Sequence, residues 1–207
     1  MKIKSLLAVA GLIAAGTAFA HDGWNDRGDR NVLFKFDGGT GVQVFRSGAG
    51  GVPALNVVAG VNPGGAPWGL TAFTATIKNT GEIRARGTGV LLLGADGIGT
   101  RAGPRQVILS LFCRSVPVPP AVAGTVLPNA FNSQPTDLDE DGNFSLKSWL
   151  ADATGAAPPL TCGDDVDNRP VLLIRAYTPA NPTTGAPAAA GPWFAAGFIS
   201  AKHGRDW

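Results

Sequence analysis

Histidine is scarce in this chain, which contains only two, His21 and His203, one near each end. No serine or cysteine lies in the Gly-x-Ser-x-Gly turn that presents the nucleophile of many hydrolases. A nucleophile usually needs an adjacent base such as an imidazole to become reactive. The sequence therefore argues against hydrolysis by a Ser–His or Cys–His pair.

Cysteine is equally scarce, with Cys113 and Cys162 as the two examples. An even number of cysteines in an exported chain favours a disulfide. The alternatives are two free thiols or a two-cysteine metal site, and the site would lack histidines to complete it. We predict a disulfide that closes a loop of about 50 residues, for which the chain-entropy estimate of stabilisation is about 4 kcal/mol.

An excess of charge is also missing. The chain has 17 Lys and Arg against 15 Asp and Glu, and Lys2 and Lys4 lie in an N-terminal segment that we expect to be removed. The remaining chain is then formally neutral. Nucleic-acid binding depends on clustered cations that meet phosphates, so the sequence argues against a nucleic-acid partner.

Long apolar runs are absent beyond the N-terminal segment. That segment has the order of a secretory signal, with two early lysines, an apolar stretch Leu6–Ala15 and a small-x-small site at Ala18–Ala20. Its apolar part is too short for a spanning helix, which needs about 20 apolar residues. We predict cleavage after Ala20, a secreted or periplasmic location, and no membrane insertion of the mature chain.

No helical stripe follows the predicted signal (residues 1–20), whereas Gly and Pro are abundant, at 29 and 16. Residues 21–30 are polar and lack a period, so we expect a flexible leader. For residues 31–207 the pattern of short runs and turns predicts one all-β domain with long Gly/Pro-rich loops. We predict an antiparallel β-sandwich, immunoglobulin-like or jelly-roll-like, with a barrel as the alternative.

The clearest hairpin combines Phe73–Ile77 with Ile83–Ala85 across a turn at Asn79–Gly81, since apolar and polar residues alternate on both sides. Gly38 and Gly39 predict a further turn between two strands. The strands expected elsewhere are Asn31–Phe36, Val42–Phe45, Leu55–Ala59, Val90–Leu93, Val107–Cys113, Phe144–Leu146, Val171–Tyr177 and Trp193–Ser200.

An acidic segment offers a candidate calcium site. Asp137, Asp139 and Asp141 alternate and are followed by Gly142, as in the first half of a helix–loop–helix calcium loop. The second half fails, because the position that needs a bidentate Glu is Ser148. A calcium site would need further oxygens, and Asp164, Asp165 and Asp167 are candidates. Asp141-Gly142 is also a strong hairpin signal, and we favour the hairpin over calcium.

Copper is a second metal hypothesis. Cleavage after Ala20 would leave His21 as the first residue, with an amine and an imidazole. Those nitrogens and a second His form the copper brace of lytic polysaccharide monooxygenases and some periplasmic copper carriers, and copper(II) favours such ligands. The resemblance to these families stops there. His203 is the other histidine and does not occupy their position.

A glycan-acting enzyme is a third hypothesis. Asp139 and Asp165 could form a carboxylate pair, although acidic turns are common. Arg84 and Arg86 could form a binding patch, but a solvated strand face explains them equally well. Trp24, Trp68, Trp149 and Trp193 could stack on sugars; for Trp149 and Trp193 we favour packing against the core.

The order of several short motifs resembles a group of secreted bacterial β-rich proteins that have no assigned activity. The motifs are Gly65-Ala-Pro-Trp68, the strand that ends at Cys113, Asp141-Gly-Asn-Phe144, Cys162 with Pro170-Val-Leu-Leu-Ile174, and Trp193-Phe-Ala195. The resemblance covers residues 60–198. It implies a secreted β fold with one disulfide, and it carries no activity and no site residues.

Together these patterns predict an exported, non-enzymatic binding or structural module with a protein or glycan partner. The alternative is a metal-binding exported protein, with calcium at Asp137–Asp141 or copper through His21. The glycan-acting enzyme remains third.

Overall fold

The computed structural model describes residues 31–43, 45–46, 53–54, 56–113, 130–163, 169–202 and 205–206. Within these residues the protein is all-β and contains no helix. The strands are β1 (Val32–Gly41), β2 (Phe45–Arg46), β3 (Pro53–Ala54), β4 (Ala72–Lys78), β5 (Glu82–Thr88), β6 (Gln106–Phe112), β7 (Ala130–Asn132), β8 (Thr136–Asp137), β9 (Phe144–Trp149), β10 (Val171–Thr178), β11 (Ala189–Lys202) and β12 (Arg205–Asp206).

Alternation of apolar and polar residues in the sequence explains the strands that have one solvent-exposed face. In β4, β5 and β9, every second residue is buried, and the residues between them face solvent or are half-buried. The inward side chains include Phe73, Ile83 and Phe144, which belong to one hydrophobic core. Strands β6 and β10 differ, because they are buried along nearly their whole length, as expected for strands covered on both faces.

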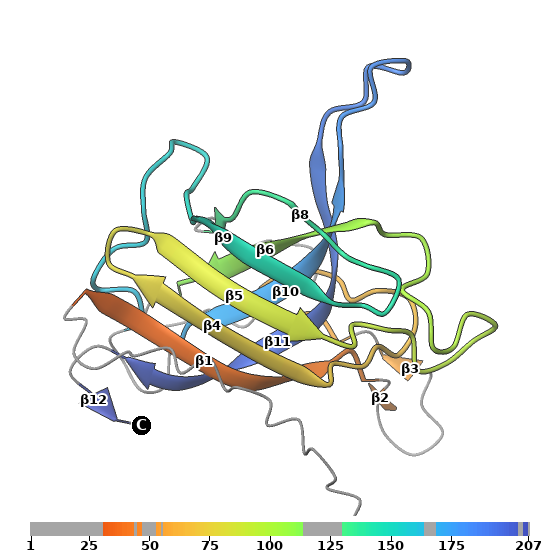
Figure 1. The fold of residues 1–207 in the computed structure, drawn as a ribbon, viewed down its shortest axis with the longest axis horizontal. Coiled ribbons are helices and arrows are strands. Elements are labelled where there is room, and N and C mark those ends of the chain that lie inside the picture. Colours follow the sequence, from red (N-terminus) through yellow and green to blue (C-terminus); the bar gives the residue numbers. More distant parts are fainter. Residues whose placement is uncertain are drawn as a thin grey trace, which may run out of the picture.

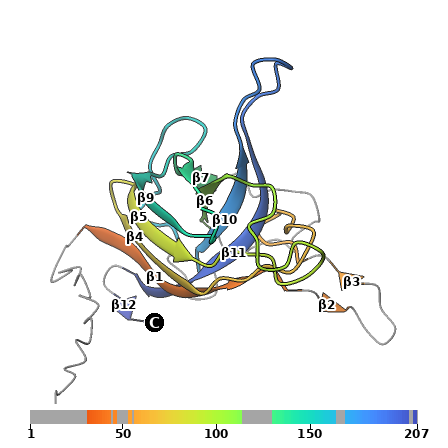
Figure 2. The same cartoon turned by 45° about the vertical axis from the view of Figure 1, so that its right-hand side comes forward.

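One large antiparallel sheet contains ten of the strands. The order across it is β7-β6-β10-β11-β1-β4-β5-β9, with β8 paired to β6 and β12 paired to β11, while β2 and β3 form a separate pair. Figure 1 shows this sheet from its broad side, and Figure 2 shows it curving round until its two ends face each other.

Hydrogen bonds join those two ends. Asn132, at the end of β7, and Ala151, just after β9, exchange two backbone bonds of 2.8 and 3.1 Å. The amide of Gln134 donates to the hydroxyl of Ser148 (3.1 Å), and the hydroxyl of Thr136 donates to the carbonyl of Ser145 (3.0 Å). We call this line of contacts the seam. The sheet is therefore nearly closed into a barrel.

Several predicted strands were correct and others were wrong. The hairpin of β4 and β5 is confirmed, with its turn at residues 79–81. The predicted turn at Gly38 and Gly39 was wrong, because β1 continues through both residues to Gly41. Gly38 has a positive φ and lies where the pairing of β1 with β11 is irregular. Val90–Leu93 was also wrong: it contributes only an isolated bridge between Leu92 and Trp68.

A projecting hairpin is formed where β10 and β11 extend beyond the body of the sheet (Figures 1 and 2). Arg175 belongs to β10 and is 8% exposed. Its guanidinium donates to the carbonyls of Gly191 (2.9 Å) and Ala190 (3.0 Å) and to the hydroxyl of Ser110 (3.4 Å). These bonds satisfy a buried cation and attach the base of the hairpin to β6.

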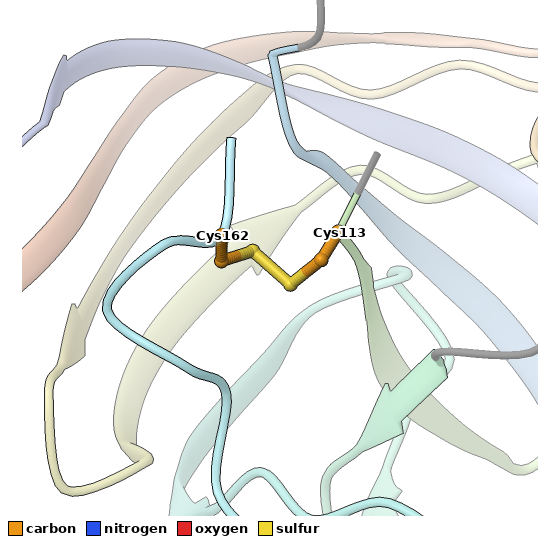
Figure 3. Close-up of a disulfide and its surroundings, with 2 residues drawn as sticks. All are labelled: Cys113 and Cys162. Carbon is orange, nitrogen blue, oxygen red and sulfur yellow. A yellow bond between two sulfur atoms is a disulfide. The ribbon is translucent and has the colours of Figure 1, made fainter. Parts of the chain in front are cut away.

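The predicted disulfide is confirmed. Cys113 follows β6, Cys162 lies in the loop after β9, and their Cα atoms are 5.0 Å apart (Figure 3). Disulfides persist mainly in oxidising compartments, so this bond indicates a location outside the cytoplasm.

The described residues include no helix of the length and apolar character needed to span a membrane.

Candidate functional site

The acidic segment forms a turn between β8 and β9, and Asp139 holds it together. One carboxylate oxygen of Asp139 accepts a bond from the amide of Asn143 (2.7 Å), and the other accepts from the Asn143 side chain (3.2 Å). The bond from the Asn143 amide is the main cause that lowers the pKa of Asp139. The backbone closes the same turn, from the amide of Asp139 to the carbonyl of Asn143 (3.0 Å).

Asp137 contacts a different part of the chain from Asp139. Its carboxylate accepts a bond from the side chain of Gln106 (3.0 Å) across the β6–β8 pair. Both residues line an open groove of about 540 Å³ at the base of the projecting hairpin, together with Arg105 and Tyr177. Asp137 and Asp139 are thus each engaged by an amide side chain, Asp137 by Gln106 and Asp139 by Asn143.

The metal hypotheses stay predictions. Within the described part of the chain, no group of three or more His, Cys, Asp or Glu side chains is arranged to hold a metal ion. The remaining residues proposed for metal binding lie outside the described residues: His21 and His203 for copper, and Asp164, Asp165 and Asp167 for calcium. The glycosidase pair Asp139/Asp165 includes one of them.

The tryptophans divide into buried and exposed examples, and Trp24 lies outside the described residues. Trp193 is 1% exposed, as predicted, and its indole donates to the carbonyl of Asn56 (3.0 Å). Trp68 is 3% exposed and packs on Phe194 with ring centroids 4.0 Å apart. Trp149 was expected to pack against the core, but it is 61% exposed. The prediction for Trp149 was wrong because alternate residues of β9 point inward and Trp149 falls on the outer side.

Trp149 belongs to a surface that we call the basic face, which comprises the outward side chains of β1, β4, β5 and β9. In antiparallel strands, residues directly opposite each other project from the same face. The register pairs Lys35 with Thr76, Thr76 with Arg84, and Arg84 with Lys147. Three cations therefore stand in one row across the four strands, whose order β1-β4-β5-β9 can be followed in Figure 1.

The charges on the basic face are unequal. Its cations are Lys35, Lys78, Arg84, Arg86 and Lys147, and its carboxylates are Asp37 and Glu82. The acidic residues of the β8–β9 turn, Asp137–Asp141, precede β9 and are not among the outward side chains of the four strands. A chain that is close to neutral overall thus carries a local excess of positive charge on one strand face.

Glu82 neutralises part of this face. Its carboxylate accepts a bond from Arg84 (2.9 Å) and lies 3.3 Å from the ammonium of Lys78. The hydrogen bond from Arg84 is the main cause that lowers the pKa of Glu82. Lys147 stands directly opposite Arg84, and like charges in that position repel. No carboxylate of the described residues lies within ion-pair distance of Lys147.

Part of the basic face could be predicted from the sequence. Arg84 and Arg86 were recognised as a candidate patch, whereas Lys147 and Trp149 were not connected with them. Alternation from Phe144 and Leu146 indicates that both Lys147 and Trp149 point outward. The pairing of β5 with β9 was the missing information. The two strands are far apart in the sequence, and only the register of the sheet places Arg84 opposite Lys147.

No protein-family model matches the chain, and comparisons with curated proteins and with solved structures likewise gave no match. The resemblance to secreted bacterial β-rich proteins therefore stays a prediction.

Proposed function

We propose that this protein is a non-enzymatic binding module of the periplasm or cell exterior and that it holds its ligand on the basic face. The observation that carries the proposal is the row of Lys35, Arg84 and Lys147 beside the exposed Trp149. A large aromatic side chain left in water is the kind of group that binding surfaces use as an anchor.

Two further observations support the proposal. The strands that carry the basic face are held by continuous backbone pairing and by core residues such as Ile77 and Ile83. The charged side chains are therefore attached to a rigid backbone. The repulsion between Arg84 and Lys147 is also a cost to the free protein, and an anionic ligand would relieve it. The disulfide supports a location outside the cytoplasm.

The test is to titrate isotope-labelled, oxidised protein with polygalacturonate, dextran and poly-L-glutamate while recording backbone amide NMR spectra. We expect at least one polymer to shift amide signals of β4, β5 and β9, and to be recovered at its original length. Signals that move only around the groove of Arg105 and Tyr177 would contradict the assignment of the face. A shortened polymer would contradict the non-enzymatic function.

We infer that the nearly closed sheet is flattened, so that its two halves pack face to face in the manner of the predicted sandwich. The inward side chains of both halves, such as Leu111 and Leu172 on one and Phe73 on the other, belong to one buried hydrophobic core, which supports close packing of the interior. The hydrogen bonds of the seam support the alternative of a closed barrel.

A further inference from the structure

The arrangement of cations on the basic face limits the chemistry of its ligand. Neighbouring strands lie about 4.8 Å apart, so the row from Lys35 to Lys147 extends about 14 Å across four strands. Arg86 lies two residues along β5 from Arg84 and on the same side. A single small anion reaches only part of such a surface, whereas a polymer with repeated anions can meet several cations at once.

Trp149 adds a second requirement. It stands opposite Glu82, two residues along β9 from the pair of Arg84 and Lys147. The exposed indole offers an apolar ring face beside a cationic row. A sugar ring presents C–H groups that can pack on such a face, while its acidic substituents reach the neighbouring cations. Hydroxyl groups of Thr76 and Ser145 on the same surface can bond to sugar hydroxyls.

We propose that the basic face binds an acidic polysaccharide, with Arg84 and Lys147 pairing with its carboxylates and Trp149 stacking on a sugar ring. This inference rests on the proposed function and names its ligand class. Charge complementarity selects the anionic polymer, and the aromatic side chain selects a saccharide over an acidic peptide.

The test uses affinity electrophoresis of the full-length, oxidised protein in gels that contain polygalacturonate. We expect retardation that weakens as salt rises, because exposed charges are screened. We expect galacturonic acid monomer to compete poorly, since it meets only one or two of the cations. The double variant Arg84→Gln/Lys147→Gln should lose about tenfold or more in affinity, because each cation removed weakens the attraction to an anionic ligand.

A matched control removes the same charge elsewhere. The double variant Arg101→Gln/Arg105→Gln changes the loop before β6, and its affinity should stay within about twofold of the parent protein. Trp149→Ala should weaken polygalacturonate binding about fivefold. It should leave any weak binding of poly-L-glutamate unchanged, since only the saccharide has a ring that stacks on the indole.

The outcomes separate this inference from the proposed function. If poly-L-glutamate or single-stranded poly(dT) binds as tightly as polygalacturonate, the face accepts polyanions of any kind and the saccharide assignment is wrong. If dextran binds at the face and polygalacturonate does not, the binding function stands and the acidic ligand is wrong. If no polymer perturbs the face, both proposals fail.

Discussion

At the scale of single residues, Asp139 determines how the turn before β9 responds to acid. Bonds from Asn143 lower the pKa of Asp139 in the folded protein. The carboxylate therefore stabilises the fold above its unfolded pKa, which is about 3.9. That contribution is lost as the pH falls through the lower pKa of the folded state.

We expect Asp139→Asn to be less stable than the parent protein at pH 6, with a difference that shrinks toward pH 2. Denaturant unfolding at a series of pH values measures this. Asp141→Asn is the control, because it removes an equal charge from an exposed position in the same turn. A stability difference for Asp139→Asn that is the same at pH 6 and pH 2 would contradict the role of the carboxylate.

Gly142 shows how little room the same turn has. Its φ is +74°, and a Cβ atom there would approach the backbone of Val90 to 2.6 Å. Gly155 has a similar φ of +87°, but a Cβ atom would meet nothing within 4 Å. Left-handed backbone costs a residue with a Cβ about 1–2 kcal/mol, and only Gly142 adds a steric clash.

We therefore expect Gly155→Ala to lose about 1 kcal/mol of unfolding free energy and Gly142→Ala to lose clearly more. Chemical denaturation of the two variants in parallel measures the difference. Equal losses would mean that the turn can move away from Val90 without cost.

At the scale of elements, the strands that face solvent on one side were the most predictable. Phe73 and Ile77 alternate with threonines, and that period of two predicts a half-buried strand without knowledge of its partner. The same reasoning misjudged Gly38 and Gly39, because two glycines can mark either a turn or an irregularity inside a strand. Only the pairing of β1 with β11 and β4 on its two sides distinguishes these cases.

The candidate site was less predictable than the fold for a related reason. Arg84 and Arg86 attracted notice because they are close in sequence, whereas Lys147 joins them through long-range pairing of β5 with β9. Trp149 was assigned to the core by its residue type, although its position two residues beyond Lys147 places it outside. Composition identifies candidate residues, and register decides which of them share a face.

The opposite positions of Trp149 and Trp193 lead to a prediction about stability. Trp193→Ala removes a fully buried side chain and should cost about 3–5 kcal/mol. Trp149→Ala removes an exposed one and should stay within about 0.5 kcal/mol of the parent protein. Urea unfolding of both variants measures this, and a large loss for Trp149→Ala would place that side chain in a buried contact.

At the scale of the whole molecule, the disulfide and the seam both hold the two ends of the sheet together. Strand β6 lies next to one end of the sheet order and β9 forms the other end. Cys113 follows β6 and Cys162 follows β9, so their bond connects the two ends covalently. The two cysteines are 49 positions apart, and the segment between them includes β7, β8 and β9 and the residues that form the hydrogen bonds of the seam.

Removing the bond should therefore weaken the seam before the rest of the sheet. For Cys113→Ala/Cys162→Ala we expect a loss of about 4 kcal/mol in unfolding free energy from the chain-entropy estimate. Hydrogen exchange should quicken most at the amides of Asn132 and Ala151, and least between β1 and β4, because local opening follows the least constrained contacts. If exchange quickens equally in all strands, the disulfide acts only on the unfolded chain, and the backbone pairs alone hold the two ends of the sheet together.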